Sequence, residues 1–325
     1  MIKILSADIG GTNSRFAYFR YDENKKLGLI ETIWLKSGEA VSFADLISKL
    51  KKSDFSLALE EAGMAVFAVA GPVEQGCYSA PPYIPWDIDI SNANKDFGLR
   101  RCTLINDFVA QAYACRSPMI ESAQDVVPGK IDPNAPLIVT GAGTALGISA
   151  LVPLINGGYI AIPSEGGHAS FPFESEPEFK YMKFLLKELG TTYITANTVV
   201  SGKGLSLLHQ FFTGEKLEPA EVTKCLNEES EVLINMARFY GRICRNFALQ
   251  FLAMGGVYIS GGVAAKLPEL VTHKEFAKEF HRSEAMARML TKIPVFLNRN
   301  EESGLWGAAL AGVRAAEFPQ KPLKG

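Results

Sequence analysis

Short apolar runs separated by glycine-rich turns open the chain. Residues 2–7, 16–19 and 27–34 are each rich in apolar, β-branched or aromatic side chains, as β-strands are. Residues 42–50 differ, because their apolar positions repeat at the spacing of one helix face, and Ser42 stands where a helix N-cap is expected. The pattern therefore predicts three strands followed by a helix.

A similar order of elements returns in the second half of the chain. The segment from Ser175 to Gly190 predicts a helix in which Ser175 and Glu178 form a capping box. A longer amphipathic helix is predicted over residues 229–254, where Cys244 falls on the apolar side. The whole pattern indicates a βββαβα-like core that occurs twice, with helical insertions in the second copy. The other predicted strands span residues 64–70, 102–105, 137–139, 148–152, 257–260 and 294–297, and a last helix starts at Ser303.

Composition allows two domains and excludes several classes of partner. The 325 residues are 47% hydrophobic, which is enough for two cores, and Pro, Asn and Asp become frequent from about Ser117, where we expect a domain boundary. The net charge is −2 with dispersed Lys and Arg, so we expect no nucleic-acid partner. Two long uncharged stretches, residues 133–164 and 246–265, are interrupted by glycines, which favours buried strands and turns over a membrane span.

Cysteine and histidine usage points to a cytoplasmic protein without a structural metal. The five cysteines are scattered and show no paired spacing, which is typical of reduced, buried thiols. The four histidines are also scattered, so no zinc site is predicted. Three of them lie on helical or charged segments and are expected at the surface: His209, His273 and His281.

The first glycine-rich turn has the composition of a phosphate site. Asp8 ends the first strand, and Gly10, Gly11, Thr12 and Asn13 follow it. Glycines tolerate positive φ and let backbone N–H groups approach an anion, and a carboxylate such as Asp8 can orient Mg²⁺ through its water shell. A hairpin that only needs glycines at its turn would show the same residues.

Two further glycine clusters strengthen the phosphate interpretation. Gly141, Gly143 and Thr144 lie in the turn of a second predicted hairpin, again with a threonine beside the glycines. Gly261-Gly262 follows a strand and opens a helix, where an adenine or ribose could approach the backbone. Close packing of strand on helix would explain this last pair equally well.

Four polar residues are candidates for binding the molecule that accepts the phosphoryl group. Asn106 and Asp107 follow a strand, at the end where open α/β sheets bind ligands, and a carboxylate there can take the proton of an attacking hydroxyl. Capping of the next helix is the competing role for Asp107. Glu165 and His168 flank two glycines, so both side chains can face one polyhydroxylated ligand; a solvated acid and a core histidine are the alternatives.

Together these motifs resemble bacterial glucokinases of the type that lacks the zinc-binding cysteine cluster of ROK kinases. The resemblance implies the two-lobed actin-like ATPase (ribonuclease H-like) fold, with a cleft between a small and a large domain. The small α/β domain would span residues 1–115 and be joined by a C-terminal helix at about 302–318, and the large domain would span 116–301. The motifs lie, in order, at residues 8–13, 105–108, 141–147, 164–171, 201–205 and 259–263.

The resemblance also implies an activity and roles for individual residues. The activity is ATP-dependent phosphorylation of the 6-hydroxyl of glucose with Mg²⁺, in a cytoplasmic homodimer. Asp107 would be the catalytic base, and Asn106, Glu165 and His168 would bind the other hydroxyls. The implied ATP, phosphate and Mg²⁺ residues are Asp8, Gly10, Gly11, Thr12, Asn13, Gly141, Gly143, Thr144, Gly261 and Gly262.

The sequence departs from the family pattern at two places near the sugar. Asn197 stands where the family usually has a sugar-binding glutamate, and Pro82-Tyr83 replaces the usual Thr-Asn before Trp86. An amide accepts hydrogen bonds without charge, a difference of about 1–2 kcal/mol or roughly 5- to 30-fold in affinity. A kinase for another hexose or an amino-sugar, or a sugar-binding regulatory protein without catalysis, therefore stands beside the glucose kinase as an alternative.

Overall fold

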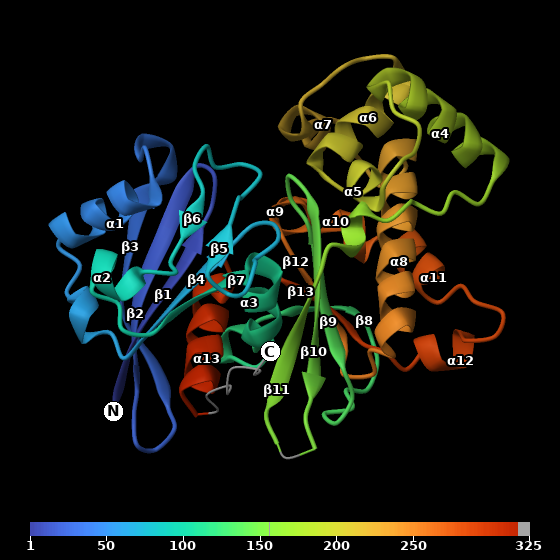
Figure 1. Ribbon diagram of the computed structural model, residues 1–325. Coiled ribbons are helices and arrows are strands. Elements are labelled where there is room, and N and C mark those ends of the chain that lie inside the picture. Colours follow the sequence, from blue (N-terminus) through green and yellow to red (C-terminus); the bar gives the residue numbers. More distant parts are fainter. Residues whose placement is uncertain (156, 318–325) are drawn as a thin grey trace. The chain divides into compact units, whose positions relative to one another are not determined.

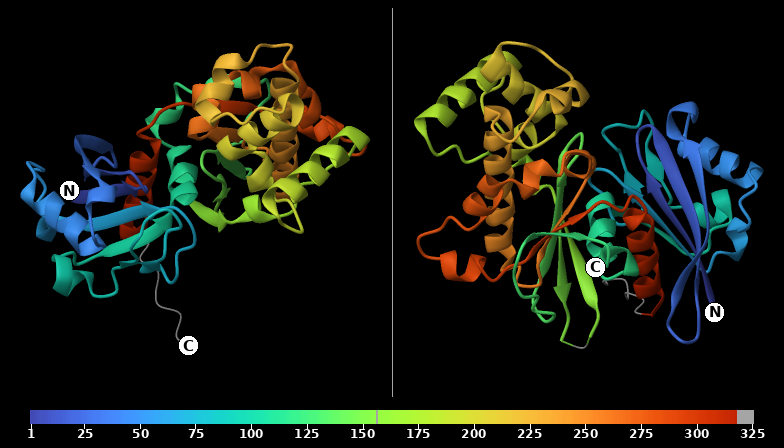
Figure 2. Two further views of the ribbon diagram at one scale, coloured as in Figure 1. Left: turned by 90° about the horizontal axis from the view of Figure 1, so that it is seen from above. Right: turned by 180° about the vertical axis from the view of Figure 1, so that it is seen from behind.

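The computed structural model describes residues 1–155 and 157–317 (Figure 1). The chain divides into two compact units. The first comprises residues 1–121 together with the described residues from 300 onward, and the second comprises Ser122–Arg299. Each unit contains one main β-sheet with helices packed on it (Figures 1 and 2).

The sheet of the first unit has the strand order β3-β2-β1-β4-β7. Strands β1, β2 and β3 are antiparallel, whereas β4 and β7 run parallel to β1. Parallel pairing places the carboxyl ends of β1, β4 and β7 at one edge, where Ile9 pairs with Val69 and Val69 with Asn106. The strands span Ile2–Ile9 (β1), Asn13–Tyr21 (β2), Leu27–Lys36 (β3), Met64–Val69 (β4) and Cys102–Asn106 (β7), and a small ribbon pairs Tyr78–Ser79 (β5) with Ile88–Asp89 (β6).

Helices cover both faces of this first sheet. The predicted N-cap of α1 is confirmed, because the hydroxyl of Ser42 accepts a hydrogen bond from the backbone N–H of Asp45 at 3.1 Å. Helices α1 (Phe43–Lys52) and α2 (Ala93–Phe97) pack on one face, and α3 (Asp107–Ala114) and α13 (Ser303–Glu317) lie side by side on the other (Figure 2).

The sheet of the second unit repeats the same topology. Its order is β11-β10-β9-β12-β13-β8, with β9 to β11 antiparallel and β12 and β13 parallel to β9. The repeat confirms the predicted duplication of the βββαβα core; β8, added at the edge, was not predicted. The strands span Gln124–Val127 (β8), Leu137–Ala142 (β9), Leu146–Pro153 (β10), Tyr159–Ser164 (β11), Val257–Ser260 (β12) and Val295–Asn298 (β13).

Helices account for most of the remaining second unit. The longest, α8, packs against β9, and the predicted core position Cys244 on it is fully buried (Figure 1). The helices are α4 (Glu176–Leu189), α5 (Ala196–Val199), α6 (Gly202–Thr213), α7 (Pro219–Cys225), α8 (Glu231–Phe251), α9 (Gly262–Lys266), α10 (Glu269–Thr272), α11 (Lys274–Phe280) and α12 (Ala287–Leu290).

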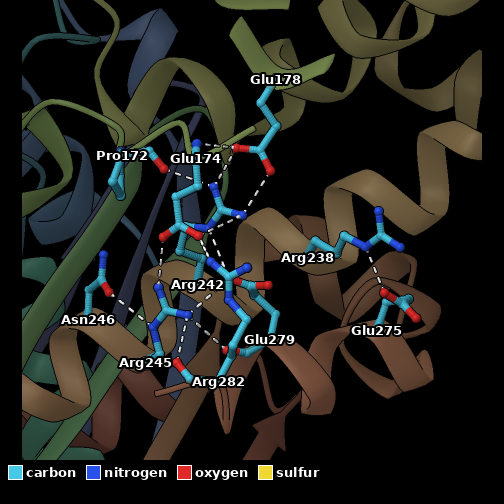
Figure 3. A network of polar contacts seen from close by, with 10 residues as sticks. All are labelled: Pro172, Glu174, Glu178, Arg238, Arg242, Arg245, Asn246, Glu275, Glu279 and Arg282. Atoms are coloured by element: carbon cyan, nitrogen blue, oxygen red, sulfur yellow. Dashed lines mark hydrogen bonds and ion pairs between the residues drawn. The ribbon is translucent and has the colours of Figure 1, made fainter. Parts of the chain in front are cut away.

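The capping box predicted at the start of α4 is wrong. Ser175 is the N-cap residue, but its side chain accepts no capping hydrogen bond. Glu178 instead accepts from the backbone N–H of Glu174 at 2.8 Å and binds Arg242, a buried arginine of α8 (Figure 3). A buried guanidinium needs a carboxylate partner, and this need outweighs the local cap.

Arg242 belongs to a buried charge network that joins α4, α8 and α11 (Figure 3). Its guanidinium donates to both oxygens of Glu178 at 2.6 and 2.9 Å and to Glu279 at 3.0 Å. Arg245, one turn further along α8, donates to Glu279 at 3.0 Å and to Glu174 at 3.2 Å. The network therefore fixes three elements of the second unit against one another.

Two smaller expectations are contradicted by the structure. His209 is buried rather than on the surface, and its ring nitrogen lies 3.2 Å from both the hydroxyl of Thr213 and the carbonyl of Glu215. Not every thiol is buried, because Cys225 is exposed. Within the described residues, none of the helices is long and apolar enough to span a membrane.

Candidate functional site

Asn106 organises the carboxyl edge of the first sheet. Its Oδ1 accepts hydrogen bonds from the backbone N–H groups of Phe108 at 2.9 Å and Val109 at 3.3 Å, and its Nδ2 donates to the carbonyl of Gly71 at 3.1 Å. Asn106 is therefore the N-cap of α3, the role that the sequence left open for Asp107. One amide hydrogen of Asn106 is left for a ligand.

Asp107 is the first residue of α3 and is partly exposed. One turn further on, Gln111 lies on the same helix face. A Cβ placed on Gly304, at the start of α13, would be 3.3 Å from Oδ2 of Asp8 and 3.4 Å from Nε2 of Gln111. The structure thus brings Asp8 and the helix face that carries Asp107 into one neighbourhood of the first unit.

The Asp8 carboxyl is influenced by both burial and a neighbouring charge. Burial raises its pKa above the ordinary value, and the positive charge of Arg15 opposes that increase. Arg15 is the cross-strand partner of Asp8 and stacks on the ring of Trp34, with its guanidinium carbon 4.1 Å from the ring centroid. It also donates to Glu301 at 3.2 Å, so its charge is held beside β1.

The turn between β1 and β2 is packed against the loop that departs from the family pattern. A Cβ on Gly11 would lie only 2.6 Å from the carbonyl oxygen of Tyr83, so glycine is required for this close approach. The neighbouring Pro82 reaches Gly71, whose Cβ position is 3.1 Å from the proline Cδ. The carbonyl of Gly71 also accepts the hydrogen bond from Asn106. The Pro82-Tyr83 loop therefore touches both the candidate phosphate turn and the glycine that binds the N-cap of α3.

The two glycine clusters of the second unit lie together. A Cβ on Gly141 would overlap the carbonyl of Ser260, and a Cβ on Gly261 would lie 2.8 Å from the carbonyl of Ala142. Gly261 has φ 136°, a conformation that favours glycine. The start of the turn that contains Gly143 and Thr144 is therefore packed, backbone against backbone, on the residues that lead into Gly262.

Glu165 and His168 lie close together in the structure. Nε2 of His168 lies 3.8 Å from Oε2 of Glu165, and the two side chains are 61% and 49% exposed. Gly167 between them packs so closely on β10 that a Cβ would overlap the carbonyl oxygen of Leu146. The acid–histidine segment is thus seated on the hairpin that carries the second candidate phosphate turn.

Asn197, the other departure, lies in α5 beside that hairpin. Its Oδ1 accepts a hydrogen bond from the backbone N–H of Leu146 at 2.6 Å. The resemblance to glucokinases predicts Asn197 as a sugar ligand, whereas nothing in the sequence points to Leu146. The backbone of Leu146 contacts both Asn197 and Gly167. No motif signals these contacts, because Leu146 contributes only backbone atoms to them.

The described residues contain no cluster of three or more His, Cys, Asp or Glu side chains suited to a metal ion. Magnesium does not need one, because it keeps several waters and is usually held by one or two carboxylates and substrate phosphates. Asp8 beside the Gly10-Gly11 turn fits this kind of site.

Duplicated sheets with glycine-rich turns define the actin-like ATPase fold, here in the form found in sugar kinases. The model of the glucokinase family matches residues 5–315. The chain belongs to the glucokinase family. A curated relative, the glucokinase of Nostoc punctiforme, is 29% identical over 97% of this chain and 100% of its own length.

Solved structures agree with this assignment. A glucokinase from an Antarctic psychrotroph has a TM-score of 0.82 at 26% identity, covering 97% of this chain and 99% of that one. A Balamuthia mandrillaris glucokinase in complex with glucose has a TM-score of 0.78 at 19% identity, covering 96% of this chain and 94% of that one, and shows the shared fold.

Replacing Gly167 by alanine is expected to destabilise the protein by about 1–3 kcal/mol, because the new Cβ would meet the backbone of Leu146 rather than a movable side chain. Urea unfolding followed by circular dichroism measures the loss. Gly262→Ala is the control, because nothing lies within 4 Å of a Cβ there. Equal stability of the two variants would contradict the predicted overlap.

Proposed function

We propose that this protein transfers the terminal phosphoryl group of ATP to the 6-hydroxyl of glucose, with Asp107 as general base. The observation that carries the proposal is the position of Asp107 at the carboxyl edge of β7, as the first residue of a helix that Asn106 caps, in a member of the glucokinase family. Gln111, one turn from Asp107 on α3, lies with Asp8 beside Gly304, which supports the same assignment.

The proposed step is an in-line displacement. The 6-oxygen of glucose attacks the terminal phosphorus of ATP while its proton passes to the Asp107 carboxylate, and the bond to the bridging oxygen breaks so that ADP leaves. Little covalent chemistry is asked of the protein. Its main task is to hold the hydroxyl, the carboxylate and the phosphate in line.

The remaining residues supply binding. Glu165 and His168, 3.8 Å apart, suit the other sugar hydroxyls, and Asn106 has one amide hydrogen to offer. The backbone turns at Gly10-Gly11 and Gly143-Thr144 suit phosphates, and Gly261-Gly262 suits the adenosine. Mg²⁺, when bound near Asp8, would neutralise charge on the phosphates.

A kinase for another hexose or an amino-sugar is the second candidate. Two observations favour it. Oδ1 of Asn197 is already bonded to Leu146, and the unusual Pro82-Tyr83 loop touches Gly11 and Gly71. Both features lie beside residues that we assign to substrate binding, so either can change sugar preference.

A coupled ADP-release assay with glucose, mannose, fructose and glucosamine tests both candidates. We expect ATP- and Mg²⁺-dependent ADP release with glucose, together with glucose 6-phosphate detected by its dehydrogenase. Preference for another sugar would replace the first candidate by the second. Absence of ADP release with every sugar would contradict both and favour a regulatory protein, and ADP or polyphosphate in place of ATP tests the donor.

A further inference from the structure

Three segments of the second unit meet at the backbone of one residue, Leu146. Its N–H donates to Oδ1 of Asn197 at 2.6 Å, and its carbonyl oxygen faces Gly167 without room for a side chain. Leu146 itself is buried at 4% exposure and pairs with Ala142 across the hairpin. The candidate phosphate turn, the acid–histidine segment and α5 are therefore linked through the backbone of a single residue.

Backbone hydrogen bonds also join the phosphate turn to the start of α6, and α5 to the acid–histidine segment. Gly202 N–H donates to the carbonyl of Gly143 at 3.0 Å, and Ala196 N–H donates to the carbonyl of Ala169 at 2.9 Å. These bonds are available to almost any residue type. The bond to Leu146 differs, because it depends on the side chain of Asn197 alone.

The chemistry of this bond fixes the orientation of the amide. A backbone N–H can only donate, so the oxygen of Asn197 must face Leu146 and its NH₂ group is the part left to face a ligand. Aspartate has nearly the same shape and keeps an acceptor oxygen at this place. Alanine removes the acceptor and leaves the buried N–H of Leu146 without it, which is costly.

We propose that Asn197 is a positioning residue that holds the 142–146 phosphate turn in register with the Glu165–His168 sugar segment. The replacement of the family glutamate by Asn197 then affects more than the strength of one sugar contact. Loss of the Asn197 side chain should loosen the turn that we assign to ATP, in addition to affecting the sugar. This inference rests on the proposed function for its kinetic part and on the hydrogen bond alone for its structural part.

Amide hydrogen exchange tests the structural part without any substrate. In Asn197→Ala, exchange of the Leu146 amide, followed by mass spectrometry over residues 143–148, should become about fivefold faster or more, because its hydrogen bond is lost. In Asn197→Asp it should stay close to wild type. The control is Thr198→Ala, in which α5 loses its Thr195–Thr198 hydroxyl contact of 2.9 Å but keeps the bond to Leu146.

Steady-state kinetics test the coupling. In Asn197→Ala, KM should rise at least about threefold for ATP as well as for glucose, whereas Asn197→Asp should keep a near wild-type KM for ATP. An increase confined to glucose would overturn the proposal and leave Asn197 as a sugar ligand only. Unchanged Leu146 exchange in Asn197→Ala would overturn it even in an active glucose kinase. Inactivity of the wild type with glucose would instead count against the proposed function, and the exchange experiment would still decide the structural part.

Discussion

Replacement of Asp107 by asparagine is expected to lower kcat for glucose phosphorylation by at least about 100-fold, the low end for loss of a general base. Asparagine keeps the size of the side chain but cannot accept the proton of the attacking hydroxyl. Stability should change by only about 0.5 kcal/mol, because Asn106 is the N-cap of α3 and the amide oxygen of asparagine can keep the hydrogen bond that Oδ1 of Asp107 accepts from the Phe108 N–H at 2.9 Å. Initial-rate kinetics and urea unfolding measure the two effects separately.

Binding measurements separate chemistry from substrate affinity in this variant. Titration calorimetry with a non-hydrolysed ATP analogue and with glucose should give dissociation constants close to those of the wild type. Asp96→Asn is the matched control, because Asp96 is an exposed aspartate on α2 of the same unit. A kcat for Asp107→Asn within about threefold of that control would remove Asp107 from the chemistry.

Asn106→Ala should lower the stability of the protein more than Asp107→Asn does. Three hydrogen bonds would be lost, to Phe108, Val109 and Gly71. Asn106 therefore supplies the N-cap of α3, so the carboxylate that we propose as the general base can occupy the first position of the helix.

Features that depend on residues close together in the sequence could be predicted. The cap at Ser42, the glycine turns after Ile9 and Ala142, and the strand that ends at Asn106 are all of this kind. In each case the residues that determine the conformation lie within a few positions of it. The duplicated core followed from these local patterns, because the same order of strands and helices occurs twice.

Partners that are far apart in the sequence could not be predicted. Ser175 and Glu178 have the spacing of a capping box, but Glu178 binds Arg242, which lies 64 positions later. Nothing near Glu178 in the sequence distinguishes a cap from a buried ion pair. The same holds for Asn197. The resemblance shows only that it replaces a glutamate of the family, and its hydrogen-bond partner Leu146 lies 51 positions away in the sequence.

The buried charge network gives the second large expected effect. Arg242 is 1% exposed, so replacing it by methionine fills a similar volume but leaves Glu178 without its two guanidinium hydrogen bonds. Breaking a buried pair on one side typically costs about 3–5 kcal/mol. We therefore expect Arg242→Met to unfold at a much lower urea concentration than the wild type.

The position of the tryptophans allows this loss to be assigned to one unit. Trp34, Trp86 and Trp306 all lie in the first unit, whereas Arg242 lies in the second. Tryptophan fluorescence thus follows the first unit, and far-ultraviolet circular dichroism follows both. In Arg242→Met the dichroism transition should begin before the fluorescence transition, because only the second unit loses its support.

Arg238→Met is the control that separates burial from charge. Arg238 lies on the same helix and donates to Glu275 at 2.6 Å, but its side chain is 39% exposed, and Glu275 keeps a second cation, Lys278, whose Nζ lies 3.5 Å from Oε1. Its loss should cost less than about 1 kcal/mol. In Arg242→Met, adding Glu178→Gln should restore part of the stability, because the second change removes the unpaired buried charge. If the two arginine variants lost equal stability, or if the double variant recovered none, the destabilisation by Arg242→Met would not come from an unpaired buried carboxylate.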